Sequence, residues 1–309
     1  MVEPLTIGRF ALAEQAIALP RGAIARGHRR MLLHDGRPLL GLTQARFRPC
    51  LFPLFTPAGY AVTQESPADH PHHNSLWIAA DHVHLHVPGP GSTTELYAYN
   101  FYVDETFQGR APGRILETAL AAAPHGGDGI ALTQAIDWRG PSEWGAPDGR
   151  LVLRETRITT VTPAPGAVLI DIESRLSPTE WEVTLGLTRH AFFNVRVADS
   201  LLHGLAVTDD RGDGASRLPW IAGAAWIDLS GPVGGGAVAG VAVMPAAPGA
   251  CWFVTDWGVA TVGQWRETAV RLAPGGVVSQ RCRFVVHDGP AVPAALAAWY
   301  RAMPRQGGP

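Results

Sequence analysis

The chain has 309 residues, of which 46% are hydrophobic, and its 25 basic and 27 acidic side chains give a net charge of −2. This hydrophobic fraction can fill a large core and excludes a disordered chain, while the balanced charge provides no basic surface for nucleic acid. Every basic residue is an arginine, and the absence of lysine excludes Schiff-base enzymes and P-loop nucleotide-binding proteins.

Short strand signals separated by turns run along most of the chain, which contains 35 glycines and 26 prolines. Near the N-terminus, the Asp35-Gly36 pair predicts a hairpin between the strand-like residues 30–33 and 39–42. Further along, apolar and polar residues alternate in five segments, which are residues 151–158, 168–176, 182–187, 193–197 and 277–286. The short intervals at which these strand signals recur along the chain are typical of antiparallel β-sandwiches.

Helical periodicity is confined to residues 290–303, which begin with a proline, are rich in alanine and carry apolar residues at steps of three and four. We find no internal repeat and no linker that would separate domains. The sequence therefore predicts an all-β protein with a single domain over residues 1–309. Its fold is a large antiparallel β-sandwich of two stacked sheets with a C-terminal helix.

The cysteines and the apolar segments bear on where the protein acts. Three cysteines without a CxxC pattern give no sign of a disulfide framework or a zinc-thiolate site. The N-terminus lacks the apolar run of a signal peptide, and no segment approaches the roughly 18 uninterrupted apolar residues of a membrane span. We expect a cytoplasmic protein with a small-molecule substrate and no nucleic-acid or membrane partner, and we leave a homo-oligomer open.

The most unusual feature is that six of the 12 histidines lie between His70 and His86. Three of them surround Pro71, where a turn could bring their side chains together. The others alternate with Val83 and Leu85, so a strand would direct all three to one face. Because imidazole is a common ligand of transition metals, we predict a divalent ion, namely zinc, manganese or iron. The predicted metal ligands are His70, His72, His82 and His84.

This interpretation has structural alternatives. His82, His84 and His86 could form the solvated face of a strand that buries Val83 and Leu85. Asp69 could orient one of the metal-bound imidazoles, or it could cap a turn.

Further polar residues are candidates for catalysis and substrate binding. We expect His73, Glu155 and His190 to act in proton transfer. The expected substrate-binding residues are Trp77, Arg157, Arg196, Asp228 and Trp252. Each has a structural alternative: Glu155 and Arg157 could form an ion pair, His190 could lie on a rim, Arg196 could pair with a carboxylate, and a tryptophan could fill core volume.

Residues 51–59 (LFPLFTPAG) and 69–77 (DHPHHNSLW) resemble the PmoA-like family of bacterial proteins, and weaker similarities cover most of residues 40–265. The resemblance implies a β-sandwich of the galactose-mutarotase-like supersandwich type and a role in sugar or polyol metabolism. Asn74-Ser75 stands where the family usually has Arg-Gly, and His82 and His84 stand where it has Asp and Asn. These departures imply an altered substrate or altered metal ligation.

We therefore predict a metal-dependent enzyme that acts on a sugar, ketosugar or glycoside, with lyase or hydrolase chemistry and with histidine and glutamate as acid and base. Three alternatives remain open at this point. The first is a metal-free mutarotase or epimerase, the second is an iron oxygenase of the cupin style, and the third is a carbohydrate-binding protein without catalytic activity.

Overall fold

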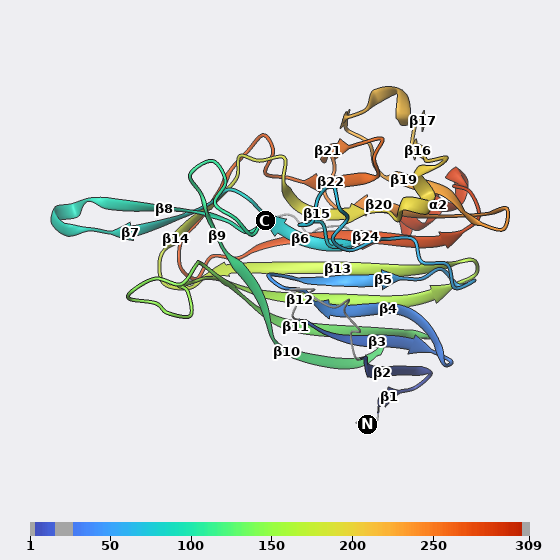
Figure 1. The fold of residues 1–309 in the computed structure, drawn as a ribbon, viewed down its shortest axis with the longest axis horizontal. Helices are drawn as coiled ribbons and strands as arrows, with labels where there is room; N and C mark the ends of the chain where they lie inside the picture. The colour runs from blue at the N-terminus through green and yellow to red at the C-terminus, as the bar shows by residue number, and fades with distance from the viewer. Residues whose placement is uncertain (1–3, 16–26, 305–309) are drawn as a thin grey trace.

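The computed structural model describes residues 4–15 and 27–304, which form three β-sheets and two short α-helices (Figure 1). The N-terminal residues 1–3 and 16–26, on which the prediction of no signal peptide partly rests, lie outside the described residues. The strands are almost entirely antiparallel, and β8 and β9 form the parallel pair among the described residues. The predicted all-β class is confirmed.

The first sheet has ten strands, in the spatial order β1 (Leu5–Ile7), β2 (Phe10–Gln15), β3 (His28–His34), β4 (Arg37–Gln44), β5 (Pro49–Leu54), β6 (Leu76–Ala80), β15 (Ala191–Arg196), β22 (Val259–Gly263), β21 (Cys251–Val254) and β18 (Trp220–Ala222). The second sheet has nine, in the order β10 (Arg114–His125), β11 (Gly129–Arg139), β12 (Leu151–Ala164), β13 (Ala167–Pro178), β24 (Val278–Asp288), β20 (Ala237–Pro245), β19 (Ile227–Gly234), β16 (Ala206–Asp209) and β17 (Gly212–Asp213).

A third sheet of five strands was not expected from the sequence. Its order is β23 (Val270–Leu272), β14 (Glu182–Leu185), β7 (Val83–Pro88), β8 (Thr94–Asn100) and β9 (Ala111–Pro112). In Figure 1, β7 and β8 extend to the left, away from the two stacked sheets. The prediction of two sheets was therefore incomplete, because strand alternation shows which face of a strand is buried but not which sheet the strand joins.

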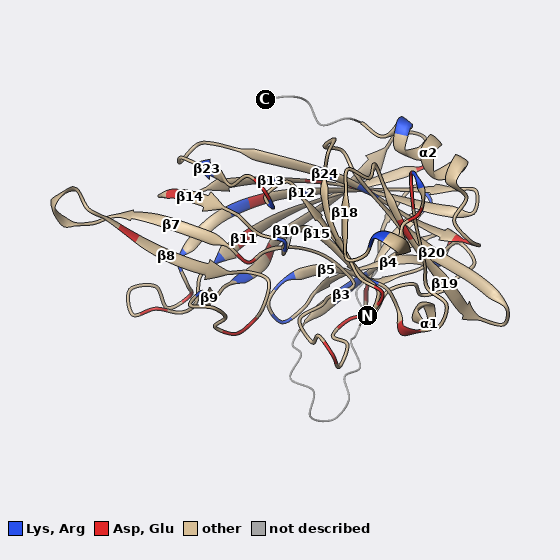
Figure 2. Cartoon of the chain, turned by 90° about the horizontal axis from the view of Figure 1, so that it is seen from above, with Lys and Arg blue, Asp and Glu red and all other residues tan. Residues whose placement is uncertain are grey.

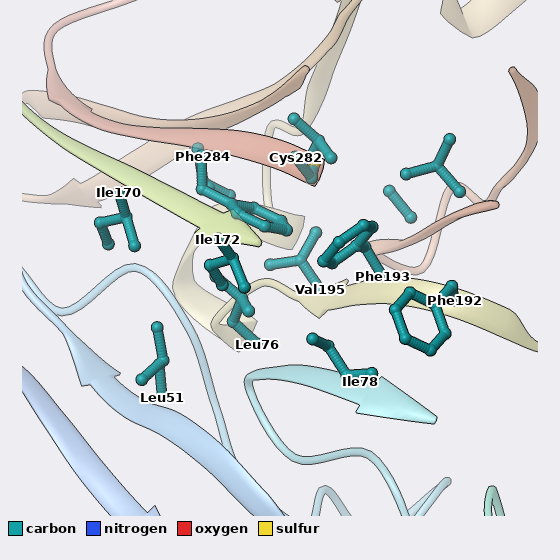
Figure 3. Close-up of a cluster of buried hydrophobic side chains, with 14 of the residues drawn as sticks. Leu51, Leu76, Ile78, Ile170, Ile172, Phe192, Phe193, Val195, Cys282 and Phe284 are labelled. Atoms are coloured by element: carbon teal, nitrogen blue, oxygen red, sulfur yellow. The ribbon is translucent and has the colours of Figure 1, made fainter. Parts of the chain in front are cut away.

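The core lies between the two large sheets. Figure 3 shows Phe193 of the first sheet beside Phe284 of the second, with ring centroids 6.2 Å apart, and Ile78 and Ile172 belong to the same cluster. All four side chains are at most 2% exposed. The alternation predicted for residues 168–176 is present in β13, which turns Ile170 and Ile172 inward and leaves Asp171 between them partly exposed. Each such side chain contributes roughly 1.5–3 kcal/mol through burial.

The first hairpin follows the turn chemistry of its sequence. Strands β3 and β4 are joined by Asp35 and Gly36, with φ angles of 49° and 76°. Two successive positive φ angles define the type I′ turn, whose twist matches that of the flanking strands, and the Asp-Gly sequence favours it. The predicted hairpin is confirmed.

The helical elements are short and peripheral. The C-terminal helix α2 (Pro293–Ala302) confirms the helix predicted over residues 290–303, and its Leu296 is buried in a cluster with Trp226 and Met244. The other helical elements are α1 (Asp199–Leu202) and the two 3-10 turns η1 (Pro90–Ser92) and η2 (Ala215–Arg217). No helix in the described part of the chain is long and apolar enough to cross a bilayer. Figure 2 shows acidic and basic residues spread over the molecule, with neither sign confined to one side.

Candidate active site

Strand register brings Asp81 and His190 together at one end of the first sheet. Strands β6 and β15 are antiparallel neighbours, and Ala80 at the end of β6 pairs with Ala191 at the start of β15. Asp81 follows β6 and His190 precedes β15, so the two residues leave the sheet at the same point. The Nδ1 atom of His190 lies 2.8 Å from Oδ2 of Asp81.

The Asp81 carboxylate is the centre of a hydrogen-bond network. Its other oxygen lies 2.8 Å from Nδ1 of His82 and accepts a hydrogen bond from the Thr188 hydroxyl. Burial alone would raise the pKa of Asp81, but the hydrogen bonds from His190 and His82 outweigh burial and hold this pKa well below its usual value. Asp81 is therefore an anion at neutral pH that orients two imidazoles.

Both imidazoles line an open cavity of about 460 Å³, together with Thr188, Arg189, Trp220 and Arg266. The side chains of His190 and His82 are 26% and 28% exposed, so solvent and small molecules can reach them. The Nε atom of Arg189 donates a hydrogen bond to Nε2 of His190 over 3.1 Å. Since Nε2 accepts this bond, the proton of the neutral ring is assigned to Nδ1, which donates to Asp81.

Beside this cavity lies a second group, the histidine turn of residues 69–73. Backbone hydrogen bonds from His70 to Pro67 and from His73 to His70 close the turn. Asp69 joins it to β15, because both of its carboxylate oxygens accept hydrogen bonds from Nη2 of Arg196 over 3.0–3.1 Å. We expected Arg196 to bind substrate, but the structure shows the alternative, a pairing with a carboxylate, and Arg196 itself is only 2% exposed.

The rings of the histidine turn are stacked. His70 lies parallel to His73, with ring centroids 4.7 Å apart, and His70 is also stacked on Trp257 at 4.6 Å. Tyr102 links this stack to the open cavity, since its ring lies 5.7 Å from His72 and 4.9 Å from His190. The histidine turn is therefore connected to His190 through Tyr102, but none of residues 69–73 lines the cavity itself.

Burial keeps the inner histidines neutral. It lowers the pKa of His72 to about 4, with Arg48 and the neighbouring imidazoles adding to the effect. Burial lowers the pKa of His73 further below its usual value, again helped by the nearby imidazoles and guanidinium groups. His73 is only 3% exposed, and its Nδ1 has no hydrogen-bond partner among the residues that the structure describes. We expected His73 to transfer protons, but the structure encloses it within the stack.

The four expected metal ligands do not form one coordination set. His70 and His72 belong to the turn, whereas His82 and His84 lie near β7 with ring centroids 6.3 Å apart. Nδ1 of His70 and Nδ1 of His82 are hydrogen-bonded to carboxylates. Across residues 4–15 and 27–304, no group of three or more His, Cys, Asp or Glu side chains has a geometry that could hold a metal ion. These residues do not fit a metal site, so we derive no step through a metal.

Strand β7 instead has the arrangement weighed as the structural alternative, in which one face is solvated and the other is buried. Val83 and Leu85 are buried, while His84 points to the opposite, partly exposed face. His86 lies on that face as well, with Nε2 2.8 Å from the Thr184 hydroxyl. The predicted alternation is confirmed, but it directs His84 and His86 to the surface of the third sheet.

Glu155 and Arg157 lie in the interior, away from the cavity. Both face inward from β12, and Arg157 donates two hydrogen bonds to Glu155 over 2.8 and 3.0 Å. Trp138 and Ser174 also donate to the Glu155 carboxylate. With these bonds made and no exposed side-chain surface, Glu155 has no route to a substrate. This is the ion pair weighed as the structural alternative.

Three more expected substrate-binding residues are also enclosed. Asp228 is buried, and its Oδ1 lies 2.7 Å from Nε2 of the buried His287. Trp252 is 1% exposed and donates to the Ala224 carbonyl, and Trp77 is fully buried. None of these side chains can contact a ligand in the open cavity.

Sequence reasoning missed Asp81, Arg189, Trp220 and Arg266 as site residues. A carboxylate directly before His82 was a usable signal, but only strand pairing reveals that His190 lies across from it. Trp220 and Arg266 reach the cavity from the edge of the first sheet formed by β18, β21 and β22. No local sequence pattern indicates that these strands lie next to His190.

Comparisons with known proteins place the chain in a family. The family model DUF6807, which is described as a family of unknown function, matches residues 30–301. No curated protein matches the chain. The matching family does not carry the PmoA-like name, so that resemblance stays a prediction.

Several solved structures are distantly similar. A candidate aldose 1-epimerase from Klebsiella pneumoniae is 10% identical with a TM-score of 0.46, and the match covers 95% of this chain and 86% of that one. A candidate mutarotase from Salmonella typhimurium is 10% identical with a TM-score of 0.33, over 87% and 96% of the two chains. The galactosidase domain of an α-galactosidase-sucrose kinase is 9% identical with a TM-score of 0.37, and the match covers 91% of this chain but only 41% of that one.

Proposed function

Because the chain belongs to DUF6807, a family of unknown function, we propose its activity from its own site: acid–base catalysis on a sugar-like substrate, of the kind that interconverts anomers or epimers. One observation carries this proposal. The buried Asp81 carboxylate holds the imidazoles of His190 and His82 by their Nδ1 atoms at the edge of an open cavity. A carboxylate in this position fixes the imidazole tautomer and stabilises the imidazolium that forms on proton transfer.

The composition of the chain supports the same chemistry. There is no lysine for a Schiff base. Burial raises the pKa of the Cys50 and Cys282 thiols well above their usual value, and burial also raises that of Cys251, which disfavours a thiolate nucleophile. Imidazole and carboxylate are the main remaining groups for proton transfer, and the cavity presents both.

The proposed reaction on a cyclic sugar needs one base and one acid. One imidazole accepts the proton of the anomeric hydroxyl through Nε2, while the other, entering as imidazolium, gives a proton to the ring oxygen. The bond between the anomeric carbon and the ring oxygen breaks, its electron pair stays on that oxygen, and a carbonyl forms. Rotation of this carbonyl and the reverse steps close the other anomer. Protons and electrons balance without a co-reactant.

Exchange NMR on a panel of aldoses and ketoses tests the proposal, because it detects anomer interconversion and epimerisation in one spectrum. We expect His190→Asn to lower kcat/KM by roughly 10²–10⁴-fold. The matched control is His203→Asn, since His203 is exposed after α1 and outside the lining of the cavity. Catalysis that persists unchanged in His190→Asn would overturn the proposal.

A further inference from the structure

Two arginines without a carboxylate partner face the candidate active site. Arg189 and Arg266 both line the cavity that contains His190 and His82. Within the part of the chain that the structure describes, neither forms an ion pair with an acidic side chain. The hydrogen bond from Arg189 goes to Nε2 of His190, and Nη1 of Arg266 donates to the Trp252 carbonyl over 3.4 Å.

An aromatic platform holds the two guanidinium groups in place. The paired strands β18 and β21 put Trp220 directly across from Phe253, and the two rings lie 4.8 Å apart. The guanidinium carbon of Arg266 is 3.5 Å from the centre of the Trp220 ring, and that of Arg189 is 5.1 Å from the centre of Phe253. Stacking fixes each guanidinium plane and leaves N–H groups at its edge free to donate.

The charge around the cavity favours an anionic ligand. Burial lowers the pKa of Arg266, and the positive charge of Arg189 lowers it further, whereas Cys251 and Glu267 act in the opposite direction. Asp81 is the carboxylate that lines the cavity, and its oxygens are already bonded to His190, His82 and Thr188, with Arg110 3.8 Å away. A neutral sugar would leave two neighbouring cations unpaired, whereas a carboxylate or phosphate would accept hydrogen bonds from both.

We propose that Arg189 and Arg266 bind the anionic oxygens of the substrate, so that the substrate is an acidic sugar derivative bearing a carboxylate or a phosphate. The claim that the anion belongs to the reacting sugar rests on the proposed function. The claim that the two arginines bind an anion does not. An anion on Arg189 also competes with Nε2 of His190 for the same guanidinium. Binding would then release the imidazole at the moment the substrate arrives.

Calorimetric titration with three probes tests the proposal: glucuronate for a carboxylate, glucose 6-phosphate for a phosphate, and glucose as the neutral reference. We expect at least one anionic probe to bind ten-fold or more tightly than glucose. That preference should be lost in the double variant Arg189→Gln/Arg266→Gln and kept in Arg154→Gln, whose arginine is exposed on β12 away from the cavity. Preference for glucuronate alone or for glucose 6-phosphate alone identifies the anion.

Equal affinity for glucose and both anions, no binding of either anion, or anion binding that survives in the double variant would each overturn the proposal. If the double variant does not fold, salt titration of the wild-type protein decides. Raising KCl should weaken anion binding and leave glucose binding unchanged, and an affinity for the anions that does not respond to salt refutes the site.

Turnover measured in parallel separates this inference from the proposed function. Arginine-dependent anion binding without His190-dependent turnover keeps the anion site and removes the proposed reaction. Conversely, His190-dependent turnover of glucose without any preference for anions keeps the reaction and removes the anion site.

Discussion

Asp81 and His190 are separated by 109 positions in the sequence, yet their side chains lie 2.8 Å apart because β6 and β15 are neighbours in the first sheet. Almost every property proposed for the site depends on this contact. It sets the proton on Nδ1 of His190, turns Nε2 toward the cavity, and compensates part of the cost of burying a carboxylate.

Replacing Asp81 by asparagine should impair catalysis more than stability. The amide keeps the shape of the side chain but not its charge, and it can donate a hydrogen bond to Nδ1, which favours the wrong tautomer of His190. We expect kcat to fall by roughly 10²–10⁴-fold, with a smaller change in KM. Steady-state kinetics check this outcome. A kcat equal to that of the wild type would show that the carboxylate does not position the imidazole.

The buried ion pair of Glu155 and Arg157 should be structural. Glu155→Gln leaves the Arg157 charge without a counterion in the core, and we expect a loss of roughly 3–5 kcal/mol in the free energy of unfolding. The folded fraction should keep its kcat. Urea unfolding measures the first effect, and activity per folded molecule measures the second. As a control, Glu182→Gln removes a more exposed pair with Arg271 and should destabilise the protein far less.

Stability should decline in mildly acidic solution because of His72. Its pKa is near 6.5 when unfolded and about 4 in the fold, so the stabilisation is fully present above pH 6.5 and is lost as the pH falls toward 4. We expect His72 to account for a loss on the order of 2 kcal/mol across this window after allowance for its partial exposure, and the buried His73 adds to the total. Unfolding curves at several pH values should show a shallower decline for His72→Gln. An identical pH dependence in the two proteins would contradict the assignment.

The link between Asp69 and Arg196 should hold the histidine turn against β15. Asp69→Asn removes two charge-assisted hydrogen bonds from the buried arginine, and we expect a loss of roughly 1–3 kcal/mol in the free energy of unfolding. Asp104→Asn is the matched control, because Asp104 lies 3.5 Å from the exposed Arg46 and such surface pairs contribute little. Equal effects of the two substitutions would argue against the anchoring role.

Metal analysis tests the separated arrangement of the expected ligands. Because His70, His72, His82 and His84 do not form one coordination set, we expect activity to survive dialysis against a chelator. Elemental analysis of the purified protein provides an independent readout. Stoichiometric zinc, manganese or iron that is lost in His72→Ala would restore the metal-dependent hypothesis drawn from the sequence.

Local features of the fold were predictable from the sequence because they depend on nearby residues. The Asp35-Gly36 turn, the alternation in β13 and the C-terminal helix each follow from short-range periodicity or turn chemistry. The third sheet could not be predicted in the same way. Hydrogen bonds between β7 and β14 join segments about 100 residues apart, and alternation carries no information on that pairing.

The candidate site was predictable only in part, for the same reason. The density of histidines pointed to the correct region, and the polar break before β15 pointed to His190. The sequence could not show that His73 would be enclosed by Trp77 and Trp257, because aromatic side chains serve equally well in a core and in a binding site. Nor could the sequence show that the Glu155 carboxylate accepts its hydrogen bonds from residues of the second sheet.

The pairing of Ala80 with Ala191 has an evolutionary consequence. Asp81 follows Ala80 and His190 precedes Ala191, so the two side chains meet only when these alanines are paired. Deleting one residue from either strand would carry Asp81 or His190 to the opposite face of the sheet. Such a deletion could leave the composition of the core nearly intact while separating Asp81 from His190. Lineages that keep the proposed activity should therefore vary their loops in length far more freely than β6 and β15.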